Sequence, residues 1–124
     1  MDRTDFIKEL EGDILPFWMD RMSDPKGGFY GKMDGNGTLV PGAEKGAILN
    51  SRILWTFASS YRVLSKKEYL DTATRAYHEI RDRFTDEEYG GLFWSLDSDG
   101  RPKDTKKQFY AIAFAIYGLA EYFR

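Results

Sequence analysis

The sequence predicts an all-α fold in which two helical hairpins form an arc of an α/α toroid, with a short β-hairpin in each connecting loop. Two observations lead to this fold class. A unit of helix, glycine loop and helix occurs twice, about 62 residues apart. Surface-type and buried-type helices alternate along the chain, as a two-layer arrangement of repeats requires. The 124 residues are enough for one small domain, so we assign residues 1–124 to a single portion of such a toroid.

The repeat is clearest in the loops. Gly27-Gly28-Phe29-Tyr30 returns 63 positions later as Gly90-Gly91-Leu92-Phe93, and each copy follows an acidic residue, Asp24 or Asp86. Each loop then continues into Asp-Gly-Asn-Gly or Asp-Ser-Asp-Gly, which are turn sequences that predict hairpins. A calcium-binding loop is disfavoured because these turns lack the spaced carboxylates and closing glutamate of an EF-hand.

The first and third helices are predicted to form the outer layer. The first spans about residues 4–22, with a kink or break at Pro16. The third spans about residues 65–83, and its start is interpreted as a capping box between Ser65 and Glu68. Each has one apolar stripe and one charged face, which is typical of a surface helix.

The second and fourth helices are predicted to form the inner layer, over about residues 43–64 and 104–124. Between Phe109 and Phe123 the only charged residue is Glu121. A helix that is apolar nearly all round is expected to be buried on every side. Two hairpins make an arc and not a ring, so we expect a truncated toroid that exposes inner-helix apolar surface and self-associates through it.

Composition narrows the functional classes. The net charge is −2 with well-mixed signs and no basic block, which argues against nucleic-acid and anionic-membrane binding. There is no cysteine, hence no disulfide or thiolate metal site. Acidic residues near the start and the lack of a long apolar run argue against a signal peptide and a membrane span, so the cytoplasm is expected. An aromatic content of 16% suits either a filled core or a sugar-stacking surface.

Arg52 is the clearest candidate for function, because it is a charged residue on a helix expected to be buried. It is either a structural ion-pair partner or a guanidinium that faces a central cavity and holds sugar oxygens. In the repeat, Arg52 aligns with Phe114, and Tyr110 lies one turn before Phe114 on the same helix face. Arg52 and Tyr110 are therefore predicted to form two walls of one pocket, although a tyrosine at such a position also suits a core.

Three further polar residues are interpreted as solvent-facing. Lys45 and Lys107 occupy matching places at the starts of the two inner helices, where the helix dipole disfavours a cation. His78, the only histidine, lies beside charged residues on an outer helix. With one histidine and no cysteine, the sequence predicts no metal site and no nucleophile–base pair.

Three segments, residues 50–57, 89–94 and 107–122, resemble the cellobiose 2-epimerase pattern of the N-acylglucosamine 2-epimerase family. The resemblance covers nearly the whole chain and the first third of a family member. It implies an (α/α)6 barrel and a cofactor-free isomerase that acts on a small-molecule sugar. The implied reaction inverts C2 of the reducing-end sugar through an enediolate, with two histidines as acid and base.

The resemblance also assigns roles to residues. Arg52 matches the arginine that supports the C1 and C2 oxygens, and Tyr110 matches a tyrosine that lines the same pocket. The catalytic histidines are expected beyond Arg124, and His78 matches neither, so activity is expected of a full-length parent and not of these residues alone. Whether the substrate is a cellobiose-like disaccharide, an N-acylglucosamine or a mannose-type sugar stays open.

Two other functions also stay open. One is a non-catalytic carbohydrate-binding or structural helical domain. The other is a fragment of an α/α-barrel glycoside hydrolase, which needs two carboxylates that flank the scissile bond. The inner helices offer only Glu44 and Glu121, at opposite ends of their helices.

Overall fold

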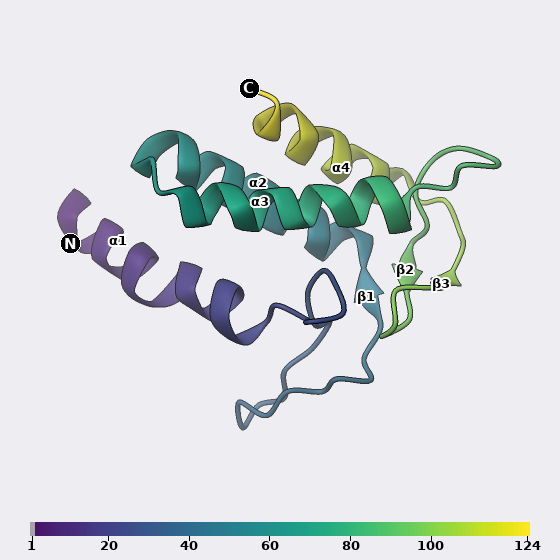
Figure 1. The fold of residues 1–124 in the computed structure, drawn as a ribbon, viewed down its shortest axis with the longest axis horizontal. Coiled ribbons are helices and arrows are strands. Elements are labelled where there is room, and N and C mark those ends of the chain that lie inside the picture. Colours follow the sequence, from purple (N-terminus) through teal and green to yellow (C-terminus); the bar gives the residue numbers. More distant parts are fainter. Residues whose placement is uncertain (1) are drawn as a thin grey trace.

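The computed structural model describes residues 2–124 and shows two layers of helices with a small sheet at one end. The outer layer contains α1 (Arg3–Glu9), which continues into the π-helical turns η1 (Leu10–Ile14) and η2 (Phe17–Arg21), and α3 (Lys67–Glu79), which continues into the π-helical turn η3 (Ile80–Phe84). The inner layer contains α2 (Ala47–Leu64) and α4 (Phe109–Tyr122). Both chain ends lie away from the sheet (Figure 1).

Local sequence explains most helix boundaries. Asp2 caps α1 through a reciprocal pair of hydrogen bonds with Asp5. Pro16 falls between η1 and η2, as expected of a residue that removes one backbone donor. The predicted capping box at Ser65 is wrong: Ser65 adopts a left-handed φ of 58° and ends α2 by donating to the Tyr61 carbonyl. An N-cap needs extended backbone, and Lys66 takes that position instead.

The inner helices begin later than predicted because the residues before them form strands. β1 (Lys45–Gly46) precedes α2, and β3 (Pro102–Asp104) precedes the loop that enters α4. Together with β2 (Ser95–Leu96) they form an antiparallel sheet in the order β1-β2-β3. The sheet thereby joins the segment that precedes α2 to the second hairpin. In addition, the Ala47 amide at the start of α2 donates to the Trp94 carbonyl.

The predicted repeat of the glycine loops and hairpins is confirmed. In the two turns, the Asp34 and Asp97 carboxylates each accept two backbone amides within the following four residues. The bridge between Met33 and Leu39 in the first copy corresponds to the pairing of Leu96 with Pro102 in the second. These aspartates act as turn-forming residues, in agreement with the hairpin interpretation.

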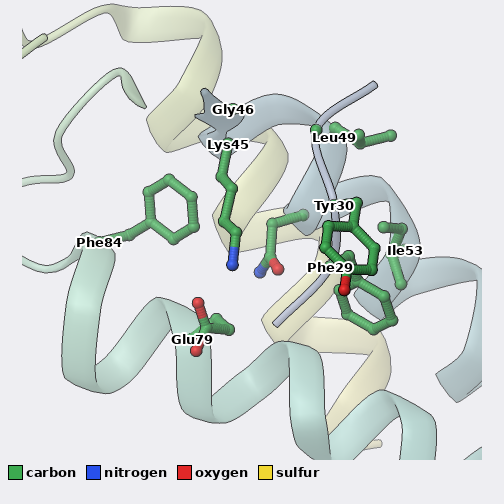
Figure 2. A pocket seen from close by; sticks show the side chains of 10 residues that line it. Phe29, Tyr30, Lys45, Gly46, Leu49, Ile53, Glu79 and Phe84 are labelled. Atoms are coloured by element: carbon green, nitrogen blue, oxygen red, sulfur yellow. The ribbon is translucent and has the colours of Figure 1, made fainter. Parts of the chain in front are cut away.

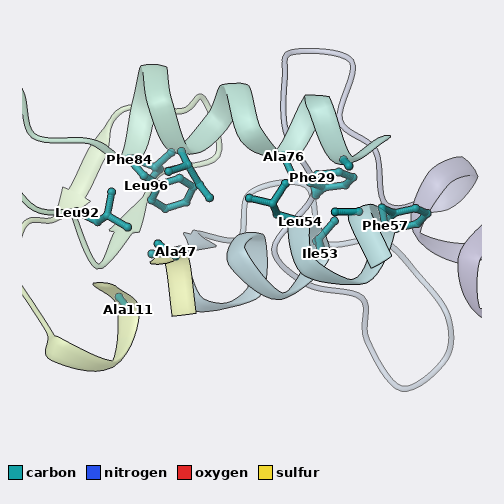
Figure 3. Packing of buried hydrophobic residues seen from close by; sticks show 14 of the residues in the cluster. Phe29, Ala47, Ile53, Leu54, Phe57, Ala76, Phe84, Leu92, Leu96 and Ala111 are labelled. Carbon is teal, nitrogen blue, oxygen red and sulfur yellow. The ribbon is translucent and has the colours of Figure 1, made fainter. Parts of the chain in front are cut away.

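The core lies between α2 and α3 and extends to the sheet (Figure 3). α2 packs against α3 on one side and against α4 on the other. The α4 contact is close because small residues line it: Ala111, Ala115 and Gly118 are the buried positions of α4. A Cβ on Gly118 would lie 2.8 Å from the Ser51 carbonyl oxygen, so the two inner helices meet nearly backbone to backbone.

The prediction that the fourth helix is buried on every side is wrong within residues 2–124. Only its α2-facing strip is covered, and Tyr110, Ile116 and Tyr117 are 71%, 63% and 60% exposed. The expectation that the chain exposes inner-helix apolar surface is confirmed by the same side chains. Among residues 2–124, no helix combines the length and the hydropathy that a bilayer crossing demands.

Candidate functional site

Two ion pairs repeat with the chain and hold the glycine loops against the inner helices. The Lys45 Nζ lies 2.8 Å from Asp24 Oδ2, and the Lys107 Nζ lies 2.7 Å from Asp86 Oδ2. The interpretation of Lys45 as solvated is therefore wrong, whereas Lys107 is paired but stays exposed to solvent. The signal was present in the sequence, because each lysine follows its aspartate at the same separation of 21 residues.

The first of these pairs is deeply buried. Lys45 also donates to the Gly27 carbonyl at 2.9 Å, and it extends from β1 toward Glu79 of α3 (Figure 2). Burial alone would raise the pKa of Asp24, but the hydrogen bonds from Lys45 and from the Lys26 amide outweigh it and lower this pKa. In the second pair, the hydrogen bond from Lys107 lowers the pKa of Asp86.

Glu79 lies beneath the first pair and is 5% exposed. Burial raises its pKa, against the opposing pull of Arg83, Lys45 and Arg75. Within residues 2–124 its Oε2 atom has no hydrogen-bond partner, and a cavity of about 10 Å³ lies beside it and Lys45. A space of this size holds about one water molecule, so this cluster is structural and is too small for a sugar.

Arg52 lies elsewhere, on the face of α2 that is turned away from α3, and it is exposed. With residues 2–124 considered, its side chain makes no hydrogen bond or ion pair, which removes the structural ion-pair interpretation for this part of the chain. It borders a hollow of about 210 Å³ between α2 and α4, lined by Ser51, Arg52, Trp55, Thr56, Phe114 and Tyr117. It also borders a second hollow of about 220 Å³ on the α1 side.

Tyr110 lies on the first turn of α4, on the same face as Phe114, and is exposed. The structure brings Arg52 together with its repeat counterpart Phe114 in one hollow, whereas Tyr110 is not among the residues that line it. The hollow therefore has Arg52 on its α2 side and Phe114 on its α4 side. The predicted contribution of Tyr110 to the same hollow is not seen. The core alternative for Tyr110 does not hold in this part of the barrel.

Two aromatic residues of the hollow were missed from the sequence. The rings of Trp55 and Tyr117 stack with their centroids 5.7 Å apart and 10° between their planes. The matched inner-helix segments contained this signal, because the two residues occupy nearly equivalent places in the repeat. Stacked rings beside a guanidinium give a surface on which apolar sugar faces and sugar hydroxyls both find partners.

The remaining candidate residues have structural environments. Glu44 pairs with Lys103 at 3.4 Å and Glu121 pairs with Arg62 at 2.7 Å, at opposite ends of the inner helices. Such separated and paired carboxylates do not flank a common site, as a hydrolase requires. His78 is exposed on α3, as expected. Across residues 2–124 no cluster of three or more potential metal ligands occurs.

Known proteins resemble nearly the whole chain. The chain is 56% identical to a cellobiose 2-epimerase of Bacteroides fragilis over 123 residues, which are 98% of this chain and 31% of that protein. It is 46% identical to a cellobiose 2-epimerase of Ruminococcus albus over 121 residues, with the same two shares. The chain thus spans about a third of the length of these relatives, and the hydrolase and simple binding-domain alternatives are not favoured.

Solved structures agree with the fold. The cellobiose 2-epimerase of Bacillus thermoamylovorans superposes with a TM-score of 0.94 at 43% identity, over 98% of this chain and 31% of that one. This match confirms the predicted arc of an (α/α)6 barrel. A D-mannose isomerase superposes with a TM-score of 0.86 at 24% identity, over 98% and 30% of the two chains, and supports the fold alone.

The family model described as N-acylglucosamine 2-epimerase matches residues 28–123, which include both glycine loops, both inner helices and the hollow at Arg52. The chain belongs to the N-acylglucosamine 2-epimerase family.

Proposed function

We propose that this chain supplies one substrate-binding wall of a cofactor-independent sugar 2-epimerase that inverts C2 of the reducing-end sugar of a cellobiose-like disaccharide. The observation that carries the proposal is the exposed Arg52 side chain in the aromatic hollow between α2 and α4. The 56% identity to a protein named cellobiose 2-epimerase supports the choice of substrate class. Because the chain spans 31% of that relative, the activity is proposed for a full-length enzyme and not for the chain alone.

Arg52 suits a role in stabilising an enediolate. A guanidinium stays charged at any physiological pH and offers five N–H donors in a planar fork. Its donors are free within residues 2–124, so they are available to the C1 and C2 oxygens of an opened sugar. Negative charge develops on these oxygens when the C2 proton leaves, and a fixed cation then stabilises the transition state more than the ground state.

The aromatic residues would position the sugar. Trp55, Phe114 and Tyr117 present ring surface to the hollow, and rings of this kind pack on the apolar faces of pyranoses. Tyr110 lies one turn before Phe114 on α4. There its hydroxyl is able to donate to or accept from a sugar hydroxyl at the end of the wall.

The test is a chimera in which this chain replaces the matching segment of the Bacteroides fragilis cellobiose 2-epimerase. With cellobiose in heavy water, we expect deuterium to enter C2 as the epimer forms. Arg52→Met should lower the rate about a hundredfold or more, because removal of a hydrogen-bond donor that stabilises transition-state charge has an effect of this size in other enzymes. Arg81→Met is the matched control, because Arg81 is an exposed arginine paired with its neighbour Asp82 on the outer layer.

The outcomes separate the alternatives. A chimera that binds cellobiose but never exchanges the C2 proton would leave a sugar-binding role only. An Arg52→Met chimera as active as the parent would remove Arg52 from the site. Exchange on N-acetylglucosamine or mannose in place of cellobiose would reassign the substrate.

We also propose that the isolated chain self-associates through the uncovered apolar strip of α4, formed by Tyr110, Ile116 and Tyr117. Light scattering at increasing protein concentration should show a mass that rises above that of one chain. Ile116→Lys, which places a charge on this strip, should reduce the rise. A concentration-independent monomer would contradict this proposal.

A further inference from the structure

The two glycine loops are copies of one element that differ in what covers them. In the first copy, Glu79 of α3 lies against Gly28, where a Cβ would stand 2.5 Å from the Glu79 Oε2 atom. Gly28 also has a φ of +67°. The absence of a side chain at this position is what makes room for the buried carboxylate.

The second copy has the same parts and no such cover. Gly90 and Gly91 have φ values of +82° and +75°. A Cβ on Gly90 would meet no atom of residues 2–124 within 4 Å, and the nearest atom to one on Gly91 is a Lys107 side-chain carbon at 3.4 Å. The Lys107 side chain is 33% exposed, against 5% for Lys45.

The cover in the first copy has a recognisable charge pattern. Glu79 is flanked on α3 and η3 by Arg75 and Arg83, each one helical turn away. Arg75 donates to the Gly28 and Asp24 carbonyls, and Arg83 donates to the Lys26 carbonyl at 2.9 Å. Glu79 and the two arginines therefore bind the first loop together. The Glu79 carboxylate lies beside the Lys45 ammonium, and the two guanidinium groups donate to carbonyls of the loop.

We propose that the second glycine loop and Lys107 form a receptor for a carboxylate side chain carried by an outer-type helix of a following repeat. The 62-residue repeat supports this occupant, since the first receptor is filled by the outer helix that follows it. Charge complementarity supports it too, because within residues 2–124 Asp86 is the only ion-pair partner of the Lys107 ammonium, which otherwise lies 5.1 Å from the centroid of the Phe93 ring. Ile116 of α4, which is 63% exposed, is the repeat counterpart of Leu54 of α2, which is fully buried. The incoming acid is expected to have a basic residue one turn away on each side.

The relatives are about three times as long as this chain, so the same chimera with the Bacteroides fragilis enzyme provides the following repeat. The experiment compares Gly91→Ala, at the counterpart of Gly28, in the chain alone and in the chimera, by urea unfolding. In the chain alone, the left-handed backbone should raise the unfolding equilibrium constant about tenfold. In the chimera, the added collision with a buried carboxylate should raise it at least a further tenfold.

Two glycines serve as matched references. Gly28→Ala should give a similarly large effect in both proteins, because Glu79 is present in both. Gly35→Ala should have a small effect in both, because its Cβ position is open and its φ is not positive. An equal effect of Gly91→Ala in the two proteins would overturn the proposal.

A second measurement needs no substitution, and its result depends neither on a folding defect of a variant nor on sugar turnover. Lysine acetylation followed by mass spectrometry should modify Lys107 faster than Lys45 in the chain alone, and equally slowly in the chimera. Carbodiimide coupling in the chimera should then join Lys107 to an Asp or Glu beyond the replaced segment, with basic residues one turn away on either side. If Lys107 couples to Asp86 alone, or stays as reactive as in the isolated chain, the receptor is empty and the inference fails.

Discussion

The first and second glycine loops contain the same lysine–aspartate pair, yet only the first is sealed from water. Lys45 and Asp24 are 5% and 4% exposed in their side chains, whereas Lys107 and Asp86 are 33% and 9% exposed. The pairs themselves are nearly identical in length. The difference comes from α3, which covers the first loop with Glu79 and two arginines.

The comparison shows that a repeat unit of this fold is not self-contained. Local sequence places the lysine beside the aspartate, but the following outer helix decides whether the pair lies in a low-dielectric environment. The energetic consequence of a pair rises steeply with burial, because removal of one partner then leaves an uncompensated charge. Three comparisons of variants test how far the two copies differ.

The largest difference is expected for removal of the lysines. Lys45→Met should lower the free energy of unfolding by about 3–5 kcal/mol, because Asp24 is left buried and unpaired. Lys107→Met should cost less, because Lys107 is 33% exposed and Asp86 keeps the hydrogen bonds that it accepts from the Glu88 and Tyr89 amides. Urea denaturation of the two variants beside the parent chain measures both. Equal losses would show that α3 does not change the energetics of the pair.

A smaller difference is expected where the two copies carry different residues. Gly31 of the first copy aligns with Trp94 of the second copy in the repeat. A Cβ on Gly31 would overlap the Glu44 carbonyl oxygen. Gly31→Ala should therefore destabilise the chain by about 1–3 kcal/mol through overpacking. Gly35→Ala is the control, because nothing lies within 4 Å of its Cβ position. Thermal unfolding should separate the two variants, and coincident melting curves would refute the close approach.

The smallest effect is a change in pH dependence. Burial raises the pKa of Glu79 above its ordinary value of 4.5, so its folded-state ionisation opposes folding. The contribution of Glu79 to stability therefore falls as the pH rises from about 4.5 through the raised pKa. Glu79→Gln removes this titration, and the variant should gain stability relative to the parent as the pH rises through that window. Urea midpoints at several pH values measure the difference; a constant offset would contradict it.

The aspartates titrate in the opposite sense and supply an internal check. The pKa values of Asp24 and Asp86 are lowered from their ordinary value of 3.8. Their stabilisation is complete above that value and is lost as the pH falls through the lowered pKa values. Acid unfolding should therefore persist in Glu79→Gln, although the slope at higher pH is gone.

Periodicity in the sequence predicted the helices, their two layers and the repeated hairpins, because these depend on residues close in sequence. The prediction failed where a segment distant in sequence determines the local secondary structure. The strands at Lys45 and Pro102 form only because β2 lies between them, so both inner helices were predicted to begin too early. Ser65 was assigned to the wrong helix because the sequence does not reveal that a left-handed residue ends α2.

The candidate site was predicted in part for the same reason. Arg52 was identified because a charge interrupts an apolar helix, and this signal is local. Its partners in the hollow, Trp55 and Tyr117, come from two helices whose contact depends on Ala111, Ala115 and Gly118. Lys45 was misjudged because a lysine at a helix start is usually solvated, and only the spacing from an aspartate that it shares with Lys107 indicated otherwise.

The hydrogen bond from the Ala47 amide to the Trp94 carbonyl imposes an order of events during synthesis. The first turn of α2 leaves the ribosome long before its partner residue exists. At roughly 5–20 residues per second, Trp94 follows several seconds later, whereas hairpins and helices form within microseconds. The nascent first hairpin must therefore wait, with β1 unpaired and the start of α2 frayed, for the second hairpin to emerge.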